Sequence, residues 1–97
     1  MAAYIIMTHF TEQGVRNIKD SPKRGQASIA LGKKMGVKVK EIFWTLGPYD
    51  TVVLAEAAND ETATAFALSL ASRGNVKTLT MRAYRAKEFS GILRKLS

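Results

Sequence analysis

The sequence of 97 residues contains no cysteine, a single histidine, only two prolines and no long apolar run. Without cysteine there is no disulfide, no thiolate metal site and no cysteine nucleophile, and one histidine argues against a multi-histidine metal site. No apolar stretch approaches the roughly 18 residues of a membrane span, and no basic segment precedes a long hydrophobic stretch at the N-terminus. These absences predict a cytoplasmic protein that uses no metal, cofactor or membrane.

The charge is positive and unevenly distributed along the chain. Fifteen lysines and arginines against eight acidic residues give a formal net charge of +7. Residues 11–46 and 76–97 are net basic, whereas residues 47–75 are net acidic. No long run of like charges occurs, so a disordered basic arm is not expected. The length is that of one small domain, and we expect residues 1–97 to form it.

Four segments rich in β-branched, aromatic and other apolar residues predict strands at 3–10, 37–46, 51–58 and 76–84. The apolar alternation of the second segment changes phase after Val39. This change predicts either a β-bulge at Lys40-Glu41 or burial of both faces beyond that point.

Helix signals lie between and after these strands. Thr11 is suited to cap a short helical turn, and Ser21-Pro22 predicts the start of a longer helix with a capping hydroxyl, which Gly36 ends. A further helix is expected from Asn59-Asp60 to Arg73-Gly74, and a last one near the C-terminus. Apolar or small residues recur at helical spacing in the three longer helices: Ala27, Ala30, Leu31 and Met35; Ala63, Phe66, Ala67 and Leu70; and Phe89, Ile92, Leu93 and Leu96.

The resulting order, β-α-β-β-α-β with a C-terminal helix, predicts an α+β fold of the ferredoxin-like plait type. In this fold a four-stranded antiparallel sheet carries the helices on one face, and the other face is uncovered. Both side-chain phases of the first and third strands are substantially apolar, although a face left to water should be polar. We therefore expect a homodimer or larger homo-oligomer in which the uncovered sheets pack together.

Four blocks of the sequence, in the same order, resemble the GYD domain family: residues 11–24, 43–50, 56–61 and 74–76. The family takes its name from a glycine-tyrosine-aspartate turn, and here Pro48 stands between Gly47 and Tyr49, with Asp50 following. The resemblance extends from Tyr4 to about Phe89. It implies a small bacterial or archaeal protein with the fold of the dimeric α+β barrels, in a family that is largely uncharacterised. Barrels of this kind include small monooxygenases, lactone isomerases, haem-handling proteins and ligand-sensing domains, so the fold alone does not select an activity.

Glu56 and His9 are the candidate catalytic residues. Glu56 shares the side-chain phase of Val52 and Leu54, so its carboxylate either pairs with a base, for which Arg82 is a candidate, or lies in a pocket with a raised pKa. His9 ends the first strand and is either a general base, a haem ligand or a surface histidine.

Six residues are expected to bind a ligand: Trp44, Leu54, Glu56, Tyr49, Asp50 and Arg24. The pocket is expected between the uncovered sheet and the partner chain, lined by Trp44, Leu54, Glu56 and His9. Tyr49 and Asp50 have either a turn role or a proton-transfer role. Arg24 lies in the first turn of a helix, where a cation opposes the helix dipole, so it binds an acidic ligand or pairs with Asp20 or Asp50.

Three functions remain open from the sequence. The first is a homo-oligomeric module that binds a small molecule or serves in assembly. The second is a cofactor-independent enzyme of the monooxygenase or isomerase type, using Glu56 or His9. The third is weak binding of polyanions through Lys33, Lys34, Lys38 and Lys40. RNA binding on the sheet is not expected, because the third strand has an acid and no aromatic residue for base stacking.

Overall fold

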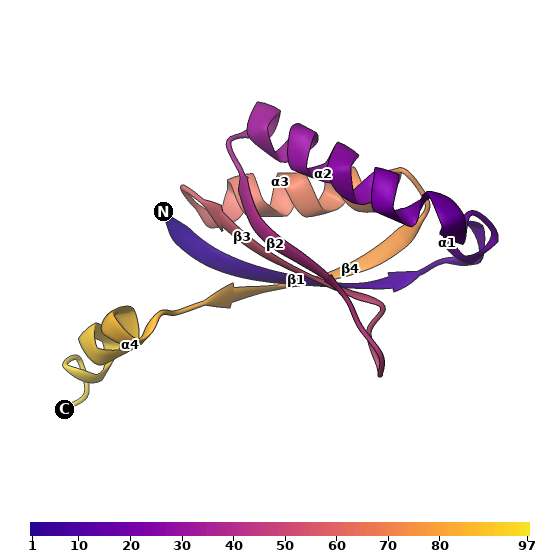
Figure 1. Ribbon diagram of the computed structural model, residues 1–97. Helices are drawn as coiled ribbons and strands as arrows, with labels where there is room; N and C mark the ends of the chain where they lie inside the picture. The colour runs from indigo at the N-terminus through magenta and orange to yellow at the C-terminus, as the bar shows by residue number, and fades with distance from the viewer.

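The computed structural model describes residues 1–97 and consists of an antiparallel sheet with two long helices across one face (Figure 1). The strands are ordered β2-β3-β1-β4 and all neighbouring pairs are antiparallel. Their bounds are Ala2–Phe10 for β1, Lys38–Trp44 for β2, Thr51–Ala57 for β3 and Val76–Ala83 for β4. The ferredoxin-like plait predicted from the sequence is confirmed.

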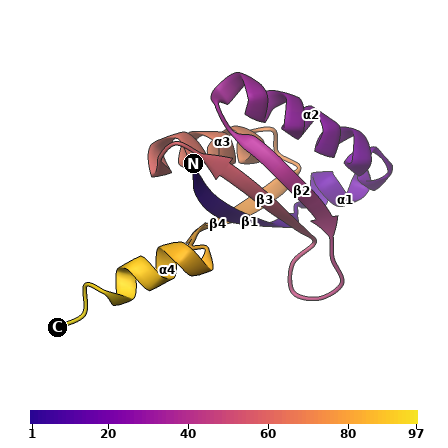
Figure 2. The same cartoon turned by 60° about the vertical axis from the view of Figure 1, so that its left-hand side comes forward.

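Helices α2 and α3 cover one face of the sheet, and α4 lies apart from both (Figures 1 and 2). The helices are α1 (Glu12–Arg16), a short 3-10 turn (Ile18–Asp20), α2 (Ser21–Met35), α3 (Asp60–Ser72) and α4 (Ala86–Leu93). None of them has both the length and the apolar character that a membrane span requires. Gly36 ends α2 in the left-handed conformation, as expected of a helix C-terminus.

Of the two alternatives for the change of phase in β2, the structure shows a bulge. Val39 lies opposite Ala55 and Glu41 lies opposite Leu54, so Lys40 is an additional residue that β3 does not match. Beyond this point Trp44 lies opposite the buried Thr51 and shares its side of the sheet. A bulge changes the side to which the following side chains point, which explains the change of phase in the sequence.

The core fills the space between the sheet and the two long helices. Phe66 of α3 and Ile6 of β1 are its largest fully buried side chains. The predicted inner face of α3 is confirmed, because all four of its residues are buried. Half-buried apolar residues pack around this core: Ala2, Leu31, Met35, Val39 and Ile42.

The prediction for the inner face of α2 is wrong at Ala30, which is exposed, whereas Gly32 is buried. Ala27 is also exposed, but it lines the space between α2 and the sheet. A Cβ atom on Gly32 would lie 2.8 Å from the carbonyl oxygen of Val37. The helix therefore approaches the start of β2 so closely that only a residue without a side chain fits there.

Helix α1 packs against the connection between α3 and β4. Thr11 caps α1 by accepting a hydrogen bond from the amide of Gly14, as predicted, and its hydroxyl donates to the carbonyl oxygen of Gly74. A Cβ atom on Gly14 would overlap the carbonyl oxygen of Asn75. These contacts fix one end of the space between the helices and the sheet.

Candidate functional site

The sheet face opposite α2 and α3, which we term the open face, is apolar across all four strands. Two rows of apolar side chains run across the strands of this face. One row contains Leu54, Ile5 and Met81, and the next contains Phe43, Val52, Met7 and Leu79, each residue paired with the one that follows. Phe43 is 48% exposed, Leu79 47% and Met81 41%. Monomeric proteins rarely leave so continuous an apolar surface in contact with water, which marks this face as an interaction surface.

Helix α4 adds a second apolar surface that nothing in the chain covers. It follows β4 and projects beyond the sheet (Figure 2), and none of its residues is buried. Phe89 is 52% exposed and Leu93 49%, and Leu96 beyond the helix is 72% exposed. Helix α4 is therefore amphipathic without an internal partner, an arrangement typical of a helix that packs on another chain.

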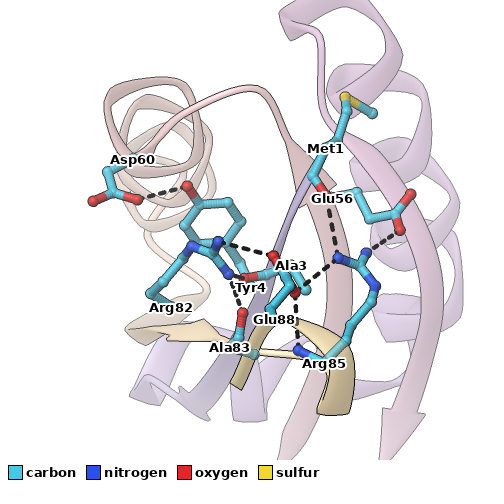
Figure 3. Close-up of polar contacts among 9 residues, drawn as sticks. All are labelled: Met1, Ala3, Tyr4, Glu56, Asp60, Arg82, Ala83, Arg85 and Glu88. Carbon is cyan, nitrogen blue, oxygen red and sulfur yellow. Dashed lines mark hydrogen bonds and ion pairs between the residues drawn. The ribbon is translucent and has the colours of Figure 1, made fainter. Parts of the chain in front are cut away.

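A cluster of charged side chains joins the first turn of α4 to the sheet (Figure 3). Arg85 pairs with Glu56 of β3 and, at 3.2 Å, with Glu88 of α4. The second oxygen of Glu88 lies 3.4 Å from the guanidinium of Arg82. The backbone amide of Arg85 donates to Glu88 at 2.9 Å, and this hydrogen bond, helped by those from Arg82 and Arg85, holds the pKa of Glu88 below its usual range. The cluster positions the base of α4 relative to β3.

Glu56 is thus ion-paired, one of the two possibilities left open by the sequence, but its partner is not the one expected. The expected partner, Arg82, binds Glu88 and donates to the carbonyl oxygen of Ala3 at 3.3 Å. Its guanidinium also lies 4.6 Å from the centre of the Tyr84 ring. The sequence did not identify Arg85 because its position depends on where the chain turns between β4 and α4.

Tyr4 links β1 to the first turn of α3 on the covered side of the sheet. Its hydroxyl donates to Asp60 at 2.6 Å (Figure 3), and only 3% of the residue is exposed. Burial is the main cause that raises the pKa of Tyr4 to about 12, and the hydrogen bond to Asp60 adds to it. The neutral phenol is therefore the form that this fold favours.

His9 and Glu56, the candidate catalytic residues, lie at opposite ends of the open face. Glu56 is opposite Ala3 of β1, six residues before His9, which corresponds to about 20 Å along the strand. The His9 ring packs on that of Tyr49, with their centres 4.7 Å apart. The two groups therefore cannot act together on one small substrate.

Asp50 holds the turn between β2 and β3 in place. Its carboxylate accepts a hydrogen bond from the amide of Phe10 at 2.7 Å, and its own amide donates to the carbonyl oxygen of Thr8 at 2.8 Å. These contacts correspond to the turn role considered for this residue.

Trp44 does not lie with Leu54 and Glu56, so the predicted grouping of these three residues is wrong. The bulge directs Trp44 to the covered side, where its indole nitrogen donates to the Ser21 hydroxyl at 2.9 Å. Ser21 begins α2 as predicted, but its hydroxyl serves Trp44 and does not cap the helix.

Arg24 also lies on the covered side, and neither of its expected carboxylate partners binds it. Its guanidinium donates to the carbonyl oxygens of Asn17 at 2.8 Å and Gly14 at 3.4 Å. Arg24 and Trp44 both line a cavity of about 160 Å³ between the sheet and helices α2 and α3. The predicted ligand residues are therefore divided among the open face, with Leu54 and Glu56, the turn between β2 and β3, with Tyr49 and Asp50, and this cavity.

Several cavity residues carried no signal in the sequence. Thr8 and Thr51 are hydrogen-bonded to each other through their hydroxyls, although they are distant in the chain. Only the pairing of β1 with β3 brings them together. No group of three histidine, aspartate or glutamate side chains is placed to hold a metal ion.

The fold and the open face together define an α+β binding domain of the ferredoxin-like type. The model of the GYD domain family matches residues 4–93, and the chain belongs to this family. The resemblance inferred from the four sequence blocks is thereby confirmed.

One relative in sequence supports this assignment, and two solved structures share the fold. A protein of Thermus thermophilus named glutamine synthetase and cystathionine beta-lyase binding protein is 36% identical over 84 residues, which cover 86% of this chain and 88% of the relative. The crystal structure of TTHA0845, also from Thermus thermophilus, is similar with a TM-score of 0.65 and 23% identity, covering 89% of this chain and 96% of that one. The crystal structure of FFRP-DM1 is similar with a TM-score of 0.59 and 20% identity, covering 87% and 100% respectively. The two crystal structures bear on the fold alone.

Proposed function

We propose that this protein is a protein-binding assembly module that pairs with a second copy of itself through the open face and α4. The observation that carries the proposal is the continuous apolar surface of the open face. Burial of apolar area is the main favourable contribution to association, and a stable interface needs about 800 Å² from each partner. A four-stranded sheet together with an amphipathic helix offers a surface of this kind.

The charges around the open face suit a second copy of the same chain. Although the chain carries a net charge of +7, Lys38 and Lys77 at the rim of this face are accompanied by Glu41 and Glu56. Two such faces related by a twofold axis can meet without net repulsion at the rim. Helix α4 reaches beyond its own sheet (Figure 2), where it is placed to pack on the partner.

The test is the molar mass in solution, measured by light scattering during size-exclusion chromatography at tens of micromolar. The unmodified protein should elute as a dimer or larger assembly, and Leu79→Glu should elute as a monomer because it places a charge within the apolar surface. Thr80→Glu is the matched control, since Thr80 is exposed on the same strand but in the opposite phase. A monomeric unmodified protein, or an unchanged Leu79→Glu assembly, would contradict the proposal.

The proposal extends to other proteins, on the support of the 36% identical relative whose name describes binding to two enzymes. The assembled form is expected to bind the glutamine synthetase of the same organism. Purified glutamine synthetase mixed with this protein should give a complex of increased mass, and Leu79→Glu should weaken it. Absence of any complex at tens of micromolar would remove this extension and leave the self-assembly intact.

A further inference from the structure

We infer that the cavity between the sheet and helices α2 and α3 is a binding site for a small organic carboxylate with an apolar body. The cavity lies on the opposite side of the sheet from the open face, so the inference does not depend on the proposed assembly. Its volume of about 160 Å³ is close to that of a dry engineered cavity known to hold benzene. A ligand with about six carbon atoms in its body therefore fits.

Apolar side chains form one part of the cavity wall. Half of its 16 lining residues are hydrophobic, and they come from the core side of the sheet, from α3 and, with Ala27, from α2. Phe66 and Val53 are buried in its wall, and Trp44 and Ile42 of β2 line it as well. Such walls favour a hydrocarbon body and give an inorganic anion no compensation for its lost hydration.

The polar part of the wall offers hydrogen-bond donors that the protein itself does not use. The Thr8 and Thr51 hydroxyls have two protons between them, and their mutual hydrogen bond uses only one. The Ser21 hydroxyl accepts from Trp44 and donates to no group of the protein. Both the threonine pair and Ser21 are buried, with at most 8% of each residue exposed. A ligand that accepts hydrogen bonds would satisfy these protons.

Two arginines give the cavity its charge preference. Arg24 uses two of its five N–H groups on carbonyl oxygens, and the guanidinium of the exposed Arg73 has no partner in the chain. No aspartate or glutamate is among the 16 lining residues. Guanidinium groups bind carboxylates through paired, charge-assisted hydrogen bonds, so an anionic head group toward the arginines completes the match.

The single tryptophan of the chain makes this inference directly testable. Trp44 lines the cavity, so its fluorescence and its indole N–H resonance report on occupancy without labelling. Titration of the full-length protein with 4-methylpentanoate should give a saturable change in both signals. The neutral 4-methylpentanamide and inorganic phosphate, which lack the charge and the apolar body respectively, should each bind at least about tenfold more weakly.

Variants locate the site and separate it from general charge effects. Arg24→Gln and Arg73→Gln should each weaken binding about tenfold, whereas Arg16→Gln should leave it unchanged. Arg16 carries the same charge nearby, but it pairs with Glu12 and does not line the cavity. Because Arg24→Gln also removes bonds to the main chain, the exposed Arg73 gives the independent measurement should the first variant fold poorly. No saturable Trp44 response to the carboxylate, equal binding of the amide, or undiminished binding by Arg73→Gln would overturn the inference.

Discussion

The two faces of one sheet differ in burial far more than in composition. In β3 the covered phase, with Thr51, Val53 and Ala55, is at most 8% exposed, whereas Val52 and Leu54 in the other phase remain half-buried in the single chain. Both phases are built mainly from apolar residues. The difference arises because α2 and α3 cover one face and nothing in the chain covers the other.

The faces also differ in where their polar groups lie. On the covered side polar side chains bond within the chain, as in the hydrogen bonds of Tyr4 with Asp60 and of Trp44 with Ser21, and the Thr8–Thr51 pair and Ser21 each keep a hydroxyl proton free for a ligand. On the open face the charged groups, such as Glu56 and Lys77, lie at the rim around an apolar centre. The covered side thus has the features of a small-molecule cavity, and the open face has those of a protein interface.

The largest expected effect contrasts two phenylalanines, one on each side. Phe66→Ala should lower the free energy of unfolding by about 3–5 kcal/mol, because it removes a fully buried ring from the core. Phe43→Ala on the open face should lower it by less than about 1 kcal/mol. Urea unfolding of both variants measures these losses. The Leu79→Glu background, which is expected to be monomeric, removes any contribution of assembly to the measured free energy. Equal losses would mean that the open face is already covered within the single chain.

A smaller effect is expected at alkaline pH, from the covered side only. The pKa of Tyr4 is raised to about 12 in the folded protein and lies near 10 in the unfolded chain. The stabilisation that neutral Tyr4 provides should therefore be complete below pH 10 and be lost as the pH rises toward 12. Thermal unfolding midpoints from pH 9 to pH 12 test this, and the decline should be smaller in Tyr4→Phe. The exposed Tyr84 provides the control, since Tyr84→Phe should leave the alkaline decline unchanged.

The smallest effect concerns the attachment of α4 at acidic pH. Since the pKa of Glu88 is lowered in the folded protein, its stabilising contribution is present above the usual glutamate pKa of about 4.3 and is lost as the pH falls through the lowered value. The backbone amide resonances of residues 85–93 should therefore shift below about pH 4, while those around Phe66 remain in place. In Glu88→Gln, which has no carboxylate at this position, the change of the residue 85–93 resonances below about pH 4 should be absent. A simultaneous change of both regions would show that α4 and the core unfold together.

Most of the fold could be predicted from local signals. The strand pattern, the bulge after Val39, the Thr11 cap and the inner face of α3 each depend on residues close in the chain. The inner face of α2 could not be predicted in the same way, because close approach to β2 leaves no room even for a Cβ atom at Gly32. A glycine has no apolar side chain, so its position on the inner face does not show in the helical pattern of hydrophobic residues.

The sites were less predictable than the fold. The sequence drew attention to Trp44 and Arg24, both of which line the cavity, but it placed Trp44 with Leu54, because the side to which Trp44 points depends on how β2 pairs with β3. The pairs Thr8 with Thr51 and Glu56 with Arg85 join residues far apart in the chain. Such pairs follow from strand register and from the path of the chain after β4, which single-sequence patterns do not contain.

The additional residue in β2 also determines which changes of chain length this sheet can accept. Deletion of Lys40 would remove the unmatched residue and leave Trp44 facing the helices, because the residues on either side of the bulge are already in step with β3. Deletion of a matched residue such as Val52 would instead exchange the inward and outward side chains of the rest of its strand. Lys40 is therefore a position at which β2 can lose one residue without changing which side chains lie on either face of the sheet.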